Sequence, residues 1–184
     1  MKTIKFLSML ALTGILFTAC SDDDETPEEV NEEEVITTMT VTLVPNGGGD
    51  TVTLQTRDLD GDGPNAPEVT VSGSLAGNTA YGGAIVLLNE TETPAENITE
   101  EVAEEDDEHQ FFFETTGSIG SVTYGDQDGN GNPVGIVFVL NTDTAGAASI
   151  TVTLRHEPKK PNDGTLADAG GETDITATFD LVIQ

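Results

Sequence analysis

Residues 148–156 read ASITVTLRH, and their pattern is the clearest indication of the fold class of the chain. Ile150, Val152 and Leu154 alternate with polar residues, so one face of the segment is apolar and the other is polar. Successive side chains of a β-strand point to opposite faces, and this alternation is typical of a half-buried antiparallel sheet. The segment therefore predicts a strand with one face against a hydrophobic core.

The same alternation recurs from residue 35 to the end of the chain, between turns rich in Gly, Asn, Asp and Pro. Helical periodicity is nearly absent; one or two helical turns are expected at residues 98–102, with Val102 facing the sheet. The pattern predicts an all-β fold, an immunoglobulin-like antiparallel β-sandwich of about seven to nine strands. The expected strands cover residues 35–44, 51–57, 68–75, 80–89, 109–115, 121–124, 134–141, 148–156 and 174–183.

Residues 1–19 have the features of a cleavable signal peptide. Lys2 and Lys5 precede a largely apolar run, residues 6–17, which is too short to serve comfortably as a permanent membrane span. Small residues then precede Cys20, the only cysteine, and this junction resembles a lipobox. The Cys20 thiol is therefore the expected acceptor of a diacylglycerol group, and two or three acyl chains give stable anchoring that one chain would not. We therefore expect the membrane to be one partner of the mature protein.

An acidic segment follows this cysteine. Residues 21–25, SDDDE, resemble the export tag of Bacteroidota lipoproteins that reach the outer leaflet, and the composition of the following residues is that of a disordered tether. We expect three regions: the signal peptide 1–19, the lipidated cysteine and tether 20–34, and a β-sandwich domain 35–184. The expected location is the outer membrane, lipid-anchored and exposed at the cell surface. A periplasm-facing orientation is the alternative.

The charge of the chain limits its partners. Thirty-four acidic residues against six basic ones give a formal net charge of −28 at pH 7. Such a surface repels nucleic acid and anionic lipid, so nucleic acid is excluded as a partner. The same charge attracts divalent cations and destabilises the folded state by self-repulsion. The composition therefore directs attention to cation sites.

The loop at residues 58–63, DLDGDG, resembles half of a calcium-binding loop. In that pattern Asp58, Asp60 and Asp62 supply alternate oxygen ligands, and a glycine permits the sharp turn. A glutamate at the twelfth loop position is absent, and Glu68, one position earlier, is the expected replacement. The alternative is a turn without metal, because Asp and Gly are also favoured turn residues.

A second copy of the pattern, DQDGNG, occupies residues 126–131 between two expected strands. Asp126, Asp128 and Asn130 are the candidate Ca²⁺ ligands, and here too the terminal glutamate is absent. Turn chemistry is again the alternative. The sequence thus predicts calcium as a structural cofactor at one or both loops.

His109 and His156 are the only histidines. If they pair across neighbouring strands, they can hold zinc or copper with carboxylates from Glu108, Glu157 or residues 104–107. The alternative is that each histidine closes the edge of the core and bonds to backbone or carboxylate groups.

The sequence does not support an enzyme. The single cysteine is expected to be acylated, no Gly-x-Ser-x-Gly motif is present, and a serine triad would need one of two histidines beside an unidentified serine. Acidic residues are so abundant that any chosen pair of carboxylates carries no information about glycosidase chemistry.

Several stretches together resemble a group of small, acidic, uncharacterised Bacteroidota lipoproteins. They are the lipobox with its acidic tail, DLDGDG at 58–63, EHQFFF at 108–113, LRHEP at 154–158 and GGETDI at 170–175. Some members carry the label "type 1 periplasmic binding fold superfamily protein", which implies a two-lobed α/β solute receptor. Period-two strands and the short length of this chain argue against that architecture. The resemblance implies a location and a class, but no activity.

These observations predict a non-catalytic cell-envelope lipoprotein. Its β-sandwich would use structural calcium loops and would bind or present an unknown ligand at the cell surface. One alternative is a metal-handling envelope protein that uses His109 and His156 to bind zinc or copper. Another is a carbohydrate- or protein-binding accessory module, which would need an exposed patch on one sheet.

Overall fold

A computed structural model describes residues 34–61 and 63–184 of the chain. The predicted signal peptide, the lipidation of Cys20, residues 20–33 of the predicted tether and the predicted ligand Asp62 lie outside this range. In the part of the chain that is described, no helix is long and apolar enough to cross a membrane.

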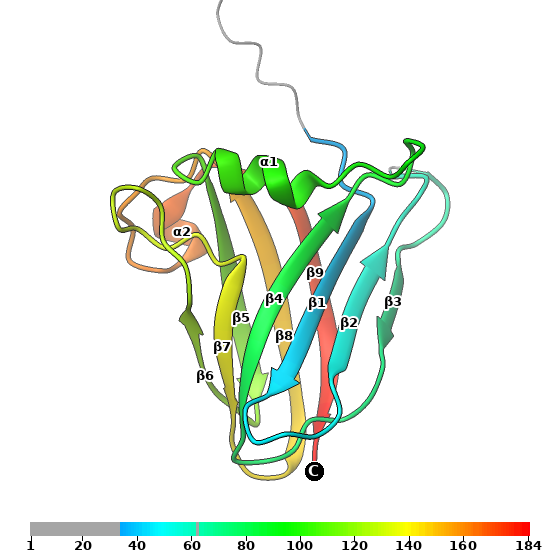
Figure 1. Ribbon diagram of the computed structural model, residues 1–184, viewed down its shortest axis with the longest axis vertical. Coiled ribbons are helices and arrows are strands. Elements are labelled where there is room, and N and C mark those ends of the chain that lie inside the picture. The colour runs from blue at the N-terminus through cyan, green and yellow to red at the C-terminus, as the bar shows by residue number, and fades with distance from the viewer. Residues whose placement is uncertain (1–33, 62) are drawn as a thin grey trace, which may run out of the picture. The chain divides into compact units, whose positions relative to one another are not determined.

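Within the described residues, nine strands form two antiparallel sheets that face each other (Figure 1). The larger sheet has the order β3-β2-β1-β4-β7-β6, and the smaller has the order β5-β8-β9. This arrangement confirms the predicted all-β sandwich. The strands are β1 (Thr38–Pro45), β2 (Val52–Arg57), β3 (Glu68–Val71), β4 (Ala80–Leu88), β5 (His109–Gly117), β6 (Ile119–Tyr124), β7 (Val137–Thr142), β8 (Gly146–His156) and β9 (Glu172–Ile183).

The hydrophobic core lies between the two sheets, and its residues follow the period-two pattern. On β8, Ile150, Val152 and Leu154 are fully buried, as the alternation predicts. The inward face of β9 supplies Phe179 and Leu181 to the same core. Both strands thus bury one apolar face, and burial of this kind is the main favourable contribution to folding.

The expected strands at residues 35–44 and 134–141 begin only at Thr38 and Val137, and a third expected strand ends early. The expected strand at residues 68–75 ends at Val71, where Ser72 and Gly73 interrupt the apolar pattern. The chain then leaves the larger sheet, and Leu75 forms a parallel bridge with Ile183 of β9. This segment therefore connects the two sheets along one side.

Helix α1 (Ile98–Glu104) joins β4 of the larger sheet to β5 of the smaller one and lies across one end of the sandwich (Figure 1). Val102, on the inner side of this helix, is fully buried, as predicted. The return from β5 to β6 passes through Gly117, whose φ of 69° favours glycine, and a Cβ there would also collide with the Ala147 carbonyl oxygen.

The outer face of the smaller sheet is partly covered, which the sequence did not predict. Gln110 and Phe112, on the face opposite Phe111, are about as buried as core residues. The segment after β8, which contains the short helix α2 (Leu166–Ala169), makes contacts with this face. Asn162 Nδ2 donates a hydrogen bond of 2.8 Å to Gln110 Oε1. This segment therefore fixes the outer side of β5 at the end where α1 lies.

Candidate metal centre

The two histidines lie side by side at this end of the sandwich. His109 begins β5, His156 ends β8, and the register of the two strands pairs them directly. Directly opposed residues of antiparallel strands point to the same face, so their side chains meet. The imidazole rings stack with centroids 4.7 Å apart and planes 13° apart. The cross-strand pair that the sequence raised as a condition for a metal site is therefore present.

Both ring nitrogens of His109, which is fully buried, face oxygen atoms. Nδ1 lies 3.2 Å from the Glu105 carbonyl oxygen, and Nε2 lies 3.0 Å from Glu34 Oε1. Burial lowers the pKa of His109, but the Glu34 carboxylate, the Glu105 carbonyl and Asp174 outweigh that effect and leave the pKa raised. The imidazole is thus held in one orientation by a backbone group and a buried acid.

Three side chains are close enough to bind one ion. Glu34, Glu105 and His109 each offer a ligand atom, and these atoms all lie within 4.8 Å of one another. Among the described residues this is the one group of three or more His, Cys, Asp or Glu side chains with such geometry. Glu34 comes from the segment before β1, Glu105 follows α1, and His109 begins β5, so three separate parts of the chain converge here.

One oxygen atom of this group is buried without a hydrogen bond. Within the described part of the chain, Glu34 Oε2 has no hydrogen-bond partner, and the polar contact of His109 Nε2 is the 3.0 Å ion pair with Glu34 Oε1. The Glu34 side chain is only 7% exposed, and that of His109 is 0% exposed. Buried polar groups are nearly always hydrogen-bonded, so an exception of this kind calls for a bound species or a role in function.

Asp174 lies beside this group, at the start of β9. With Glu34, His156, Glu172 and Thr173 it lines a small cavity of about 120 Å³. Burial, followed by the charge of Glu34, raises the pKa of Asp174 to about 6. Its Oδ2 atom is another buried oxygen without a hydrogen-bond partner among the described residues. The acidic surroundings of His109 therefore extend to β9.

The other carboxylates that were predicted near the histidines take different positions. Glu108 Oε2 lies 3.9 Å from His156 Nε2, which places it at the rim of the centre. The exposed Glu157 follows His156 with a φ of 47°, and its N–H donates to the Glu108 carbonyl oxygen. From residues 104–107, Glu105 alone joins the group of three.

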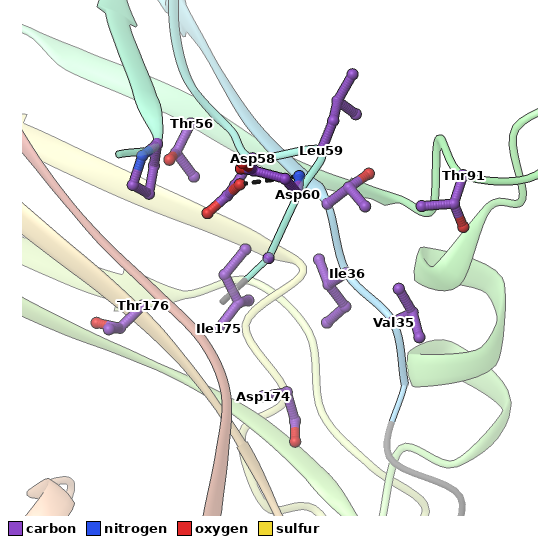
Figure 2. Close-up of a pocket in the computed structure, with 13 residues that line it drawn as sticks. Val35, Ile36, Thr56, Asp58, Leu59, Asp60, Thr91, Asp174, Ile175 and Thr176 are labelled. Atoms are coloured by element: carbon purple, nitrogen blue, oxygen red, sulfur yellow. Dashed lines mark hydrogen bonds between the residues drawn. The ribbon is translucent and has the colours of Figure 1, made fainter. Parts of the chain in front are cut away.

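The first Asp/Gly loop forms one wall of a larger cavity of about 470 Å³ (Figure 2). Asp58 Oδ1 accepts a hydrogen bond from the Asp60 N–H, and Asp60 Oδ2 accepts one of 2.6 Å from Asn65 Nδ2. Glu68 lies on β3 opposite Arg57. These contacts are those of a turn that holds itself together, and calcium binding at Asp58, Asp60, Asp62 and Glu68 stays a prediction.

In the second loop, the carboxylates of both aspartates accept hydrogen bonds from the protein. Asp126 accepts from the backbone N–H groups of Gly135 and Val137, and Asp128 accepts from those of Asn130 and Asn132. Calcium at Asp126, Asp128 and Asn130 also stays a prediction.

A lysine ammonium group lies next to this loop. Lys160 Nζ is 3.5 Å from Asp128 Oδ2 and donates hydrogen bonds to the carbonyl oxygens of Asp106 and His109. The Lys160 side chain is 6% exposed and that of Asp128 is 0% exposed. A positive charge of the protein itself is therefore present at this loop.

Sequence patterns did not identify Glu34 and Asp174 as members of the centre. Glu34 ends an acidic run that composition assigns to the tether, although its side chain is packed against His109. Asp174 stands just before an alternating strand, where acids are common. Both residues are far in sequence from His109, so only long-range pairing of the strands brings them to it.

The arrangement has the donors for a transition-metal ion: an imidazole nitrogen and carboxylate oxygens, with a second imidazole alongside. Comparisons of this chain with protein families, curated proteins and solved structures found no match.

Proposed function

We propose that this protein is a non-catalytic, lipid-anchored protein of the cell envelope that binds a transition metal, zinc or copper, through His109, Glu34 and Glu105. The observation that carries the proposal is the buried contact between His109 Nε2 and the Glu34 carboxylate, whose second oxygen, Oε2, lacks a hydrogen-bond partner among the described residues. Cys20 would attach the domain to the membrane, and the histidine end of the sandwich would hold the ion.

The orientation of His109 supports a metal ion. A carbonyl oxygen can only accept, so the contact of Nδ1 with the Glu105 carbonyl oxygen is a hydrogen bond only if Nδ1 carries a proton. Nε2 then faces the Glu34 carboxylate, either as the N–H of an imidazolium, which the raised pKa of His109 favours, or as the lone pair of a neutral ring bound to a cation. Histidines that bind metals usually donate their other ring N–H to such a backbone or carboxylate oxygen.

The distances suit a small ion. Zinc binds imidazole nitrogen and carboxylate oxygen at about 2.0–2.2 Å, so two ligands of a tetrahedral ion lie about 3.3 Å apart. The observed 3.0 Å between His109 Nε2 and Glu34 Oε1 needs only a small separation of these groups to admit the ion, and the Glu105 carboxylate, 3.9 Å from His109 Nδ1, would have to turn towards it. Copper shares the preference for imidazole, and carboxylates alone would favour calcium or magnesium instead. The histidine therefore determines the choice of metal class.

The proposal is tested by equilibrium dialysis of the full-length chain in non-ionic detergent against zinc or copper, at about 0.15 M salt to screen surface charge. Millimolar magnesium should be present to compete for the many exposed carboxylates. We expect one tightly bound transition-metal ion per chain. The substitution Glu105→Gln should weaken binding at least about tenfold, since even groups outside the ligand shell cost that much.

Glu104→Gln is the matched control, because Glu104 is an exposed neighbour on α1 that does not belong to the group of three. His109→Asn should abolish the tight site, and its circular dichroism spectrum shows whether the variant folds. Equal affinity of the wild type and the Glu105→Gln variant would contradict the proposed ligand set. Absence of any tight zinc or copper binding would overturn the function.

A further inference from the structure

Glu34 is where the described domain begins, and the preceding chain leads back to Cys20, the predicted lipid anchor. Thr37 is the first residue of this segment whose backbone is held, through a 3.0 Å hydrogen bond from its N–H to the Leu88 carbonyl oxygen. Within the described part of the chain, residues 34–36 form no backbone hydrogen bonds. The side chain of Ile36 packs against the core, so the position of Glu34 depends on that contact and on its own side chain.

The surroundings of that side chain are mostly of its own charge. A ligand atom of Glu105 lies within 4.8 Å of those of Glu34 and His109, and Asp174 lines the same small cavity as Glu34. Buried charges need a partner of opposite sign, because their desolvation is otherwise uncompensated. A protonated His109 supplies one positive charge among three carboxylates, whereas a divalent ion would supply two and attract all three. We therefore expect the Glu34 side chain to stay in its buried position when a cation is bound and to leave it more readily without one.

We propose that the metal ion acts as a clasp that fixes Glu34 to the sandwich. When the ion is bound, residues 34–36 are held against the sandwich, and when the ion is absent they are released. This inference rests on the proposed metal-binding function and adds what the ion does. The ligands make the connection directly, since Glu34 belongs to the segment leading to the anchor while Glu105 and His109 belong to the sandwich. Metal availability would then control how the domain is attached to its tether.

Cleavage by a glutamyl endopeptidase tests the clasp, because this protease cuts after glutamate and must have Glu34 accessible. The full-length chain in detergent is digested with and without zinc, and mass spectrometry follows the product that begins at Val35. Proteolysis of a locally opened segment tracks the population of the open form. With free zinc about tenfold above its dissociation constant, we expect cleavage of the Glu34–Val35 bond to slow about tenfold.

Glu92 supplies an internal reference, since it is exposed in the loop between β4 and α1, and zinc should leave the rate at the Glu92–Thr93 bond unchanged. In the Glu105→Gln variant zinc should no longer protect the Glu34–Val35 bond at the same concentration, whereas Glu104→Gln should retain protection.

Dialysis separates the two proposals. Tight zinc binding without protection of the Glu34–Val35 bond would overturn the clasp and leave the metal-binding function standing. Equal slowing at Glu34 and Glu92 would also overturn it, because the effect would then be general. No zinc binding in dialysis would overturn the function on which the clasp rests.

Discussion

Lys160 shows how a single residue places a positive charge beside an acidic loop. Its ammonium group donates to the carbonyl oxygens of Asp106 and His109, at 2.5 and 2.6 Å, and lies 3.5 Å from Asp128 Oδ2. Burial lowers the pKa of Lys160, and the charge of Asp128 opposes that shift. The lysine therefore connects the second Asp/Gly loop to the first residue of β5, next to the metal centre.

Removing this charge should be costly. We expect Lys160→Met to lower the free energy of unfolding by about 3 kcal/mol, because it leaves a buried carboxylate and two carbonyl oxygens without their cation. Lys159→Met is the matched control: the Lys159 side chain is 60% exposed, and its ion pair with Asp168 lies at the surface, where such pairs contribute little.

Urea denaturation of both variants measures the difference. Similar stabilities for Lys160→Met and Lys159→Met would contradict the structural role of the buried ammonium group. A gain in calcium affinity of Lys160→Met over the wild type would in addition indicate that the lysine occupies the place of a metal ion at this loop.

Between elements, the pairing of β4 with β7 depends on a glycine opposite an aromatic ring. Gly83 pairs directly with Phe138, and a Cβ at position 83 would collide with the Phe138 ring. Phe138 is fully buried and its ring packs at 4.5 Å from that of Phe113 on the facing sheet. The ring thus covers the glycine and carries the contact from one sheet to the other.

Gly83→Ala should therefore destabilise the protein by about 2 kcal/mol, the usual cost of extra volume in a packed core. Its neighbour Gly82 provides the comparison, because a Cβ there would meet its nearest atoms, in Asn46 and Val44, at 3.9 Å. Gly82→Ala should leave the stability unchanged or slightly higher, since it also reduces the freedom of the unfolded chain. Thermal unfolding of the two variants distinguishes them. Equal changes in the midpoint would show that the Phe138 ring moves aside to accommodate the added methyl group.

At the scale of the whole molecule, the dominant property is the net charge of −28. Self-repulsion of this size destabilises the compact state and is screened by salt. The described ion pairs that involve lysine or arginine use Arg57, Lys159 and Lys160, so most acidic groups have no basic side chain beside them. Folding must therefore be supported by the sandwich core against an unfavourable electrostatic term.

We expect the midpoint of thermal unfolding to rise as NaCl increases from 0.01 M to 0.15 M, because the Debye length falls from about 30 Å to about 8 Å. A chelator keeps the metal centre empty during this measurement. KCl should produce the same rise as NaCl, since screening depends on ionic strength and not on the identity of the monovalent ion. A midpoint that stays constant or falls would show that the acidic surface does not limit stability.

The strands were predictable because each one carries its own pattern. All nine expected strands are present, and the inward residues of β8 and the burial of Val102 follow from local periodicity. The covered outer face of β5, where Gln110 and Phe112 are buried, was not predictable, because the segment that covers it comes from after β8. Local periodicity reports which face a side chain takes, and it contains no information on what lies opposite.

Local patterns in the sequence were enough to predict the fold class, the strands and the two histidines as candidates for a metal site. The packing of Glu34 against His109, the approach of Glu105 and the position of Asp174 beside them appear only in the folded chain. The physical reason is the distance along the chain between these residues. Alternation acts over a few neighbouring residues, whereas this centre forms only when β5, β8 and β9 pair in one register and the segment before β1 packs against their end.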